Sequence, residues 1–404
     1  MFSVVNKWEK GDTVLRQKKI KIYPNKEQKK ILNNWFGTSR FVYNRLLNAI
    51  NDPSEYYKTF NNDEDPLKYE VNLSQLFNEF DYMNFYSMRN HYVTKKNNNH
   101  LYNWEFETPK DIRAGSLKQL ISNFKSAFTN KRKQNIVDFK IKYKSKKNIH
   151  KSITIPKYTI KINKKSINIF STFIKEPLKV KSRTQKQLKD IKIEHDCKLI
   201  YDGLGFFLLV PYKKKVKTKK DKKKIVALDP GVRTFQTGYS KDRYFKSESR
   251  TKILKKYYKK IDILKSLRKG RKAVLKLGAK IRNTVNDIHW KTINYLTKKY
   301  NDVLLPNFES QEMCKKRQLN KSTNRIFMSL QHYKFKQRLI DKTKETINFR
   351  VHIVREDYTS KTCTNCGNIN NNLKGKKIYT CENCSLSIDR DINGARNILL
   401  KYLQ

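Results

Sequence analysis

The spacing of apolar residues near the start of the chain predicts a strand followed by helical structure. Apolar and basic residues alternate over 14–23, which is the two-residue period of a strand. Asn25 follows the proline that ends this strand and is well placed to cap a helix. Apolar residues then recur at helical spacing over 26–35 and over 40–50, so we expect two helical stretches there.

The middle of the chain contains the clearest helical pattern and then a change of period. Apolar residues form one stripe along Ser116–Asn130, and Lys118 and Lys125 lie off that stripe. From Val137 the period becomes two, with basic residues at the alternate positions. Short strands of this kind predict a small β domain or barrel over 132–212, which the N-terminal strand would join.

The C-terminal half reads as an α/β domain behind a basic linker. The linker, 213–224, has almost no apolar content. After it, a buried-type strand over 225–228 is followed by long helical and short strand-like segments in alternation up to residue 404. The fold class we predict is therefore multidomain α+β, with an N-terminal β-barrel-like domain, an inserted helical domain and a C-terminal α/β domain.

Charge narrows the function to the binding of polyanions. The 404 residues include 90 Lys+Arg and 36 Asp+Glu, which gives a formal net charge of +54. Positive charges at this density repel one another in a folded protein, and binding to nucleic acid would neutralise them. The longest apolar run, Phe206–Val210, is too short to span a bilayer, and Met1–Lys10 has no signal-peptide core. We therefore expect an intracellular protein with no membrane partner, rather than a secreted scaffold or a small acidic-substrate enzyme.

Four of the six cysteines form two CxxC pairs within twenty-two residues: Cys363, Cys366, Cys381 and Cys384. Each CxxC turn directs two thiolates at one ion, and two such turns complete a tetrahedral shell. In a chain without a secretory signal this clustering indicates one Zn²⁺ rather than disulfides. A closed four-thiolate shell has no open position, so the zinc is expected to be structural.

Carboxylates stand where chemistry is expected in an α/β domain. Asp229 ends an apolar strand, a position that directs its side chain into the crevice at the edge of a sheet. Asp389 and Asp391 open the last helix, and one of the two is expected to be its N-cap. Carboxylates gathered in one place repel unless divalent cations lie between them, as in a two-metal phosphodiester site.

Several segments resemble the transposon-associated TnpB RNA-guided nucleases and, more narrowly, their eukaryotic and viral relatives called Fanzor, which are related to the compact type V CRISPR effectors. The resembling segments span nearly the whole chain in matching order, with poorest coverage over 50–108. They are Lys19–Gln28, Phe36–Asn44, Ala227–Gly231, His289–Leu296, Tyr358–Gly367 and Asp389–Ile398.

The resemblance implies a RuvC-like, RNase H-type nuclease domain with a zinc module inserted before its last helix. Its first carboxylate corresponds to Asp229 and its last to Asp391, with Asp389 the less favoured neighbour. Bacterial members place a Glu where this chain has Pro306.

Two residues are candidates for the missing middle carboxylate. Glu309 lies three residues after Pro306, and Glu356 follows the strand 351–355. We favour Glu356, because Fanzor members resemble this arrangement and a strand end beside Asp229 supplies better geometry. If neither residue serves, the nuclease is inactive.

Nucleic-acid contacts are expected from aromatic, Arg, Asn and Lys side chains in the N-terminal half and from two arginines beyond it. Such residues stack on bases, read base edges or bind phosphates, although about half of the early set would serve the core instead. The candidates are Trp35, Arg40, Tyr43, Asn44, Lys118, Lys125, Arg317 and Arg325.

The resemblance, together with the charge and the carboxylate pattern, implies an RNA-guided DNA endonuclease in which two Mg²⁺ ions are held by Asp229, Glu356 and Asp391. The partners would be an omega-type guide RNA, bound by one protein per RNA, and double-stranded target DNA next to a short flanking motif. The nucleus or a viral replication compartment is the expected location. The alternatives are an RNA-guided DNA-binding protein whose nuclease has decayed, for which Pro306 is the sign, and a basic RNA-scaffolding protein with a zinc ribbon.

The domain boundaries that we predict assign each region a role. A β-barrel RNA-binding domain comprises 1–27 and 132–212, and a helical recognition domain comprises 28–131. The nuclease domain comprises 225–360 and 386–404, and the zinc module of 361–385 would contact the target nucleic acid.

Overall fold

The computed structural model describes residues 3–4, 12–51, 85–94, 101–308, 320–371 and 377–403, apart from positions 164, 182–184, 186, 187, 189, 190, 222, 242 and 269. Contacts along the chain divide it into two compact units. The N-terminal unit is Leu15–Tyr212, and the C-terminal unit combines Met1–Val14 with Lys213–Gln404.

The N-terminal unit is built on an antiparallel sheet of seven strands. In spatial order the strands run β3-β7-β8-β2-β6-β5-β4. Alternate side chains of these short strands enter one core with α1. The order has β3 and β4 at its two edges, and the barrel-like closure stays a prediction. The strands are β2 (Thr13–Tyr23), β3 (Lys151–Ile155), β4 (Ile160–Ile162), β5 (Ser166–Ile169), β6 (Leu178–Val180), β7 (Cys197–Tyr201) and β8 (Phe206–Lys215).

The first helix of this unit, α1 (Lys26–Asn51), is continuous where the sequence predicted two stretches. Its cap is as expected: Asn25 Oδ1 accepts from the backbone N–H of Gln28 at 2.8 Å, and the Gln28 side chain accepts from the N–H of Asn25 at 3.0 Å. The polar residues in its middle face α5 rather than solvent. Ser39 and Ser116 share a hydroxyl–hydroxyl hydrogen bond of 2.8 Å, and this buried pairing explains why the apolar pattern breaks without breaking the helix.

The other helices of the N-terminal unit are short except for α5, which runs over Lys110–Arg132 and contains the predicted Ser116–Asn130 stripe. They are α4 (Phe85–Tyr92), η2 (Asn103–Glu107) and η3 (Lys157–Thr159).

The segment 137–143 is not a strand, although its apolar residues alternate. The side chain of Asn44 on α1 satisfies the backbone of Lys144 from both sides, accepting from its N–H at 2.8 Å and donating to its carbonyl at 3.0 Å. The residue that directly follows the segment is therefore held by a side chain of α1 rather than by a neighbouring strand.

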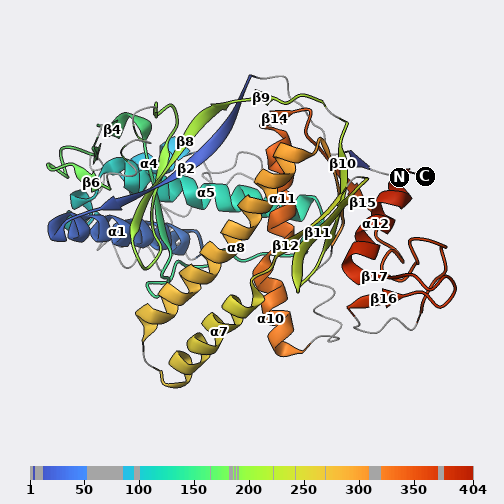
Figure 1. The fold of residues 1–404 in the computed structure, drawn as a ribbon. Helices are drawn as coiled ribbons and strands as arrows, with labels where there is room; N and C mark the ends of the chain where they lie inside the picture. Colours follow the sequence, from blue (N-terminus) through green and yellow to red (C-terminus); the bar gives the residue numbers. More distant parts are fainter. Residues whose placement is uncertain are drawn as a thin grey trace. The chain divides into compact units, whose positions relative to one another are not determined.

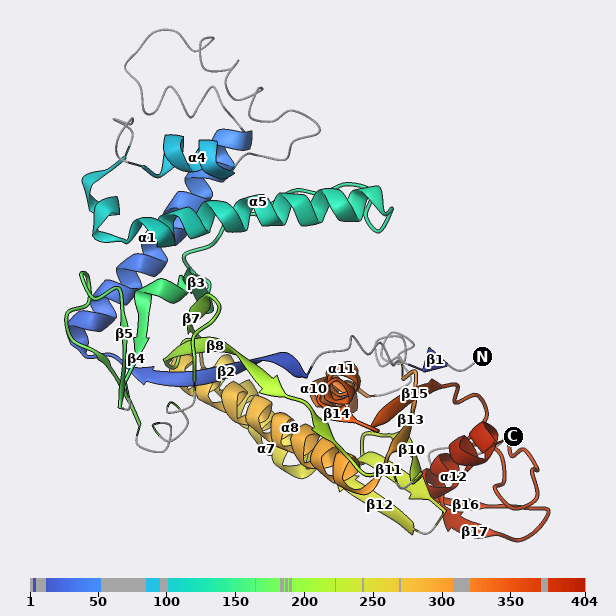
Figure 2. The ribbon, with the colours of Figure 1, turned by 90° about the horizontal axis from the view of Figure 1, so that it is seen from above.

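The C-terminal unit contains a mixed sheet of six strands in the order β1-β15-β13-β10-β11-β12. Figure 1 labels β15, β10, β11 and β12 of this sheet, and Figure 2 labels β1 and β13 as well. Strands β10, β11 and β12 form an antiparallel meander, while β10, β13 and β15 run parallel to one another. The strands are β1 (Ser3–Val4), β10 (Ile225–Pro230), β11 (Thr234–Ser240), β12 (Arg243–Glu248), β13 (Asp302–Pro306) and β15 (Arg350–Val354).

Helices cover both faces of this sheet (Figure 2). Val226 and Leu228 of β10 point to the core shared with α7 (Thr251–Ser266), α8 (Arg271–Lys299), α10 (Lys321–Leu330) and α11 (His332–Thr343). Ala227 points the other way, to the core shared with α12 (Arg390–Leu403). Because side chains alternate along a strand, Asp229 belongs to the α12 face. No helix among the described residues is long and apolar enough to cross a membrane.

Part of the basic segment 213–224 is held in place within the C-terminal unit. Strand β9 (Lys217–Thr218) pairs in parallel with β14 (Thr346–Ile347). Lys214 forms an ion pair of 2.7 Å with the mostly buried Glu345. Neither the strand pairing nor the ion pair is marked by apolar residues in the sequence, so the sequence pattern alone predicts a linker here.

Candidate functional site

Asp229 lies near the carboxyl end of β10, inside the C-terminal unit. Residue 229 still pairs with Thr237 of β11, so the ladder fixes its backbone. Its side chain faces α12 and approaches Gly394 of that helix so closely that a Cβ on Gly394 would lie 2.8 Å from Asp229 Oδ2. A sheet and a helix therefore hold this carboxylate between them.

Asp389 and Asp391 have different roles at the start of α12. Asp389 Oδ1 accepts from the backbone N–H groups of Asp391 and Ile392 at 3.0 and 3.3 Å, and its other oxygen pairs with Lys246 Nζ at 2.6 Å. The expectation that one of the two aspartates caps the helix is thus met by Asp389. Burial opposes the ionisation of Asp389, but Lys246 and the helix N–H groups outweigh it and lower its pKa. Asp391, one residue inside the helix, has no cap to make.

Glu356 follows β15 and is partly buried. Its carbonyl accepts from the hydroxyl of Thr359 at 2.9 Å, which starts the turn that leads to the cysteine cluster. The neighbouring strand β13 ends in the buried Pro306, paired with Val354, and offers no carboxylate there. Of the two candidates for the middle carboxylate, Glu309 lies outside the described residues.

Four carboxylates line a cavity of about 680 Å³ at this end of the sheet, together with five cationic side chains. The carboxylates alone would repel one another and would also repel a phosphodiester. The mixture instead provides anionic ligands for metal beside cationic groups for phosphate. The charged lining residues are Asp229, Glu356, Asp389, Asp391, Arg233, Lys246, Lys255, Lys377 and Arg390.

The electrostatics of Asp229 are those of a carboxylate without enough positive charge nearby. Burial raises its pKa well above the usual range, and the charges of Asp391 and Glu356 raise it further, while Arg390 offsets only part of the effect. Burial also raises the pKa of Glu356, with Asp357 adding to the shift. Carboxylates that are costly to ionise together in one cavity are suited to divalent cations, which remove that cost.

The carboxylates and the cysteines form two separate groups of potential metal ligands. Among the described residues, the four cysteines have donor atoms that all lie within 4.8 Å of one another. Asp229, Glu356 and Asp391 instead share the lining of the cavity.

The four cysteines do form one cluster. Cys363 Sγ lies 3.6 Å from Cys384 Sγ, and Cys366 Sγ lies 3.6 Å from Cys381 Sγ. A tetrahedral zinc with Zn–S bonds of about 2.3 Å has sulfur atoms about 3.8 Å apart, so the cluster is compatible with a structural zinc.

Local structure brings the four sulfur atoms together but gives the thiols different pKa values. The second CxxC sits in the turn between β16 (Ile378–Thr380) and β17 (Ser387–Asp389), and Gly367 after the first has φ +77°. The backbone at Asn368 lowers the pKa of Cys366 to about 6, whereas burial raises the pKa of Cys363 to about 11. The buried side chains around the cluster are few, mainly Tyr379 beside the sulfurs, so this segment has little core of its own.

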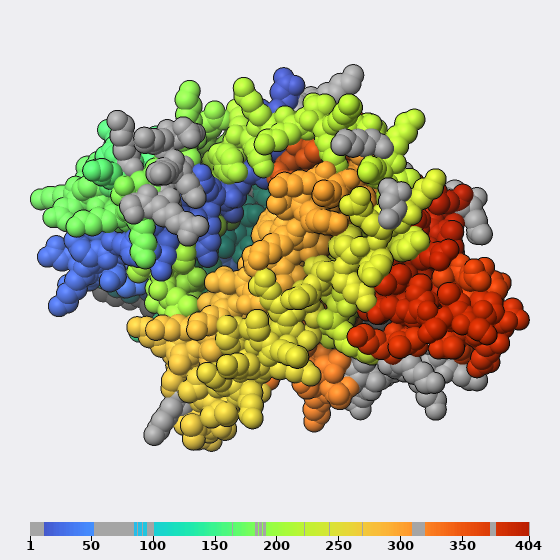
Figure 3. Space-filling model, in the orientation of Figure 1, coloured from blue at the N-terminus to red at the C-terminus, as the bar shows by residue number. Residues whose placement is uncertain are grey.

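Two asparagines that the sequence analysis did not single out tie the cluster segment to α12. Asn393 Nδ2 donates to the carbonyl of Thr362 at 2.8 Å and its Oδ1 accepts from the N–H of Thr364 at 3.1 Å. Asn397 donates to the carbonyls of Thr359 and Thr362 at 2.8 and 2.7 Å. Their i, i+4 spacing around Gly394 was the available signal. In Figure 3 the red C-terminal segment lies directly against the yellow-green strands of the same unit.

The residues predicted to contact nucleic acid are placed differently from one another. Trp35 is fully buried against Phe170, and Tyr43 is 2% exposed, so both belong to the core and we leave them out of the proposed contacts. Arg40 is partly exposed, in a pocket with Lys144 and His150.

The remaining predicted contacts lie on helix surfaces or outside the described residues. Asn44 is occupied by the backbone of Lys144, while Lys118 and Lys125 are exposed on α5. Arg325 Nη1 pairs with Asp262 at 2.7 Å and its guanidinium lies 3.9 Å from the centre of the Tyr258 ring, which joins α10 to α7. Arg317 lies outside the described residues.

Three family models match parts of the chain. They are described as a Cas12f1-like TNB domain over residues 332–398, a helix-turn-helix domain over 14–59 and a probable transposase over 209–317. The first includes Asp391 and all four clustered cysteines, and the last includes Asp229. The described part of the second range consists of β2 and the single helix α1.

Similar proteins occur in large viruses. A putative transposase, A625R, of Paramecium bursaria Chlorella virus 1 is 32% identical over 409 residues, which cover 96% of this chain and 87% of that protein. The TnpB-like protein L770 of Acanthamoeba polyphaga mimivirus is 28% identical over 95% of this chain and 73% of its own length. Among solved structures, the mini-RNA-guided endonuclease CRISPR-Cas phi3 covers 99% of this chain and 93% of its own, at 10% identity and a TM-score of 0.45, too low to support a comparison of folds.

Proposed function

Because this chain belongs to the TnpB/Fanzor-like family of transposon-associated proteins, related to the compact type V effectors, we propose that it is an RNA-guided DNA endonuclease. The observation that supports the nuclease most directly is that Asp229, Glu356 and Asp391 line the same cavity. A transposase acts on DNA, which supports DNA as the substrate. The formal charge of +54 is of the size needed to hold RNA and DNA together.

The proposed nuclease domain is RuvC-like. The strand order supports this proposal. The first strand of the antiparallel meander, β10, pairs in parallel with β13, and β13 pairs in parallel with β15. In this arrangement Asp229 and Glu356 come from the same end of two parallel-running strands, and Asp391 comes from the helix that covers them. The segment with the four cysteines lies between β15 and α12, where a structural zinc would hold it folded.

The site residues would divide the chemistry between them. Asp229, Glu356 and Asp391 would hold two Mg²⁺ ions, which supply charge stabilisation to the attacking and leaving oxygens of the phosphodiester. Asp389 and Lys246 fix the first turn of α12 and so set the direction of Asp391. Arg233, Lys255 and Lys377 line the same cavity, where they would bind the phosphates flanking the cleaved bond.

The remaining parts of the chain would hold and position the nucleic acids. The β domain (1–27 and 132–212) would grip a guide RNA of the omega type, one protein per RNA. The helical region 28–131 would hold the RNA–DNA hybrid and read a short flanking motif through Arg40, Lys118 and Lys125. The four-cysteine module would direct the DNA strand to the site. We propose the nucleus or a viral replication compartment as its location.

The test begins with the RNA that co-purifies when the chain is expressed beside its native flanking DNA. One discrete structured RNA with a variable end supports guidance, whereas a smear of cellular RNA contradicts it. The complex is then given a DNA matching the variable end, with Mg²⁺ or with EDTA, and compared with Asp229→Ala. Cleavage that needs both Mg²⁺ and Asp229 supports the nuclease; targeted binding without cleavage would show the inactive form that Pro306 makes conceivable.

A further inference from the structure

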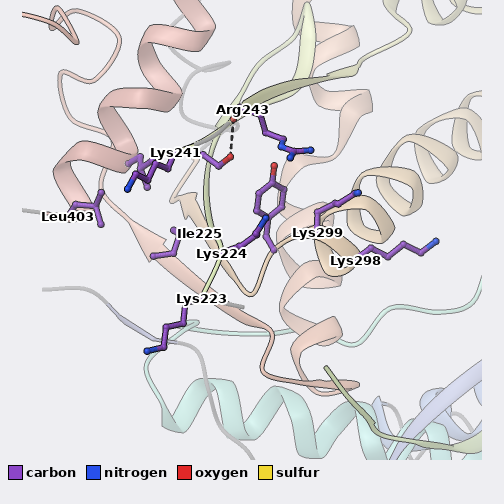
Figure 4. A pocket seen from close by; sticks show the side chains of 11 residues that line it. Lys223, Lys224, Ile225, Lys241, Arg243, Lys298, Lys299 and Leu403 are labelled. Carbon is purple, nitrogen blue, oxygen red and sulfur yellow. Dashed lines mark hydrogen bonds between the residues drawn. The ribbon is translucent and has the colours of Figure 1, made fainter. Parts of the chain in front are cut away.

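A second hollow of the C-terminal unit lies away from the carboxylates and has the opposite charge. It has a volume of about 420 Å³, and Figure 4 shows Leu403 on one side of it, Lys299 on the other and Arg243 above. We call it the basic pocket. Its lining residues are Lys223, Lys224, Ile225, Ser240, Lys241, Arg243, Lys298, Lys299, Tyr300, Leu399 and Leu403.

Cations reach the basic pocket in pairs from three segments that are far apart in sequence. Lys223 and Lys224 precede β10, Lys241 and Arg243 border the turn between β11 and β12, and Lys298 and Lys299 end α8. No acidic residue is among the described lining residues, and Asp242, which stands between Lys241 and Arg243 in the sequence, lies outside the described part of the chain. The described lining therefore presents six like charges, whose mutual repulsion a bound anion would relieve.

These six cations are available to a ligand. Within the described part of the chain, none of the six side chains forms an ion pair with a carboxylate, in contrast to Lys246 beside the catalytic cavity. All six residues are exposed, so their amino and guanidinium groups remain hydrated and mobile enough to follow a phosphate.

The floor of the basic pocket is apolar. Leu399 and Tyr300 are buried there, and Leu403 of the same helix as Leu399 is 62% exposed at its edge. The hydroxyl of Ser240 donates to the carbonyl of Arg243 at 3.0 Å, which closes the β11–β12 turn above the floor. A ring of cations around an apolar floor suits a nucleotide, whose phosphates are charged and whose sugar and base are not.

The basic pocket and the catalytic cavity lie at opposite ends of β10. Ile225, which lines the pocket, is the first residue of the strand, and Asp229 is the fifth. Four steps along a strand span about 13 Å. A phosphate in the pocket is therefore beyond reach of the carboxylates.

We propose that the basic pocket binds backbone phosphates of a nucleic-acid strand that the chain holds without cutting it. The inference rests on the proposed function, in which one strand must be retained while another is hydrolysed. The phosphodiester is the ligand chemistry, and RNA and DNA are its two sources.

Two matched pairs of variants of the full chain test the proposal without involving the carboxylates. Leu403→Asp places a negative charge at the pocket, while Leu400→Asp places the same charge on α12 outside the lining. Lys298→Gln with Lys299→Gln removes two pocket cations, while Lys272→Gln with Lys276→Gln removes two exposed cations from the same helix. The probes are fluorescein-labelled oligouridylate and oligothymidylate of equal length, titrated over a salt series.

If the basic pocket binds phosphates, each pocket variant should weaken the binding of at least one probe by about fivefold or more relative to its control variant. The Lys298/Lys299 variant should also lower the salt slope by about 0.7 for each phosphate that the pocket no longer neutralises. Weaker binding of oligouridylate alone identifies RNA as the strand, and weaker binding of oligothymidylate alone identifies DNA. Equal effects of pocket and control variants on both probes would overturn the proposal.

The assay separates this inference from the proposed function. Binding by the pocket needs no cleavage, so Asp229→Ala should bind both probes as the unmodified chain does. A chain that fails to cut DNA but shows the pocket effect would contradict the endonuclease and leave the pocket standing. A chain that cuts DNA under guidance but shows no pocket effect would contradict the pocket proposal and leave the endonuclease proposal standing.

Discussion

The carboxylate of Asp229 occupies the space that a side chain on Gly394 would need. A Cβ at that position would stand 2.8 Å from Oδ2 and 3.4 Å from Cγ of Asp229. Gly394 lies in the second turn of α12, three residues after Asp391. The glycine therefore lets the helix that carries one site carboxylate approach the strand that carries another.

Gly394→Ala should abolish most cleavage without unfolding the chain. Its Cβ forces either the Asp229 carboxylate or α12 to move, and displacement of a group that stabilises charge costs about a hundredfold in rate. Nucleic-acid binding should stay within about twofold. The control is Gly278→Ala on α8, where only the far end of Arg282 comes near, at 3.6 Å. The control should stabilise its helix by up to about 1 kcal/mol and leave cleavage intact. An active Gly394→Ala enzyme would contradict the placement of Asp229 in the site.

The two aspartates that open α12 should respond differently to amide substitution. Asp389→Asn keeps a capping oxygen and loses the ion pair with Lys246, so its cleavage rate should fall less than about tenfold. Asp391→Asn removes a proposed metal ligand and should lower the rate about a hundredfold or more. Initial rates at saturating Mg²⁺ distinguish the two, and a dead Asp389→Asn beside an active Asp391→Asn would reverse the assignment.

The middle carboxylate is tested in the same way. Glu356→Gln should abolish cleavage and leave DNA binding unchanged, because Glu356 lies in the cavity with Asp229. Glu309→Gln serves as its counterpart and should cleave at close to the full rate. The opposite pattern would transfer the role to Glu309.

The cysteine cluster should carry about one zinc per chain, measured by mass spectrometry of the metal. Cys381→Ser should lose it, because the closed shell needs four thiolates. Cys197→Ala is the matched control, since Cys197 is buried in the N-terminal unit far along the chain from the cluster. Full zinc content in Cys381→Ser would contradict a four-cysteine site.

Asn397 should contribute measurably to stability through its two carbonyl partners. In Asn397→Ala the carbonyl of Thr359 loses its hydrogen bond from Asn397, at a cost of about 1–3 kcal/mol for a buried group left unpaired, while the carbonyl of Thr362 keeps the hydrogen bond from Asn393. Lys401→Ala on the same helix loses only an exposed 3.4 Å hydrogen bond and should stay within about 0.5 kcal/mol. Urea denaturation followed by hydrogen exchange of peptides from α12 measures both, and equal midpoints would contradict the role of Asn397.

The C-terminal unit should lose stability as the pH falls from 6.5 towards 4. Burial lowers the pKa of His289 to about 4, and Arg338, whose Nη1 lies 3.0 Å from Nδ1, opposes its protonation. The unfolded chain therefore binds this proton at a higher pH than the folded chain, and folding weakens by about 2 kcal/mol between pH 7 and 5.

His289→Leu isolates this contribution. The variant should be less stable at pH 7, because Leu330 and Arg338 lose a partner, yet its stability should depend less on pH. His332, whose pKa burial lowers to about 3, retains its own share of the slope. Hydrogen exchange of α8 peptides in urea at pH 7 and 5 measures the difference, and an unchanged slope would contradict the effect.

Local signals in the sequence were sufficient for the features that depend on neighbouring residues. The cap at Asn25 and the turn of each CxxC pair are set within a few residues, and both were predicted. The apolar stripe of α5 was predicted as well, although the helix starts six residues earlier, at Lys110, where a proline precedes it.

Features that depend on residues far apart in the sequence were not predicted by the local pattern of apolar and polar residues. Alternation over 137–143 predicted a strand that the structure does not have, and Asn44, one hundred residues before Lys144, binds the backbone of Lys144 directly after that segment. Trp35 and Tyr43 have the chemistry of nucleic-acid contacts, and tertiary packing buries them instead. The pairing of Gly394 with Asp229 joins residues 165 positions apart (394 − 229), so no local pattern marks it. Asp229, Asp389 and Asp391 became candidates because strand ends and helix starts are themselves local signals, whereas Glu356 was favoured with the help of the family resemblance.

The most direct test of the central claim is to rewrite the variable end of the co-purified RNA and map where the complex cuts. The account predicts that cleavage follows the new sequence, requires Mg²⁺ and disappears in Asp229→Ala while RNA binding persists. Cleavage that stays at the original DNA site, or that continues unchanged without Asp229, would contradict it.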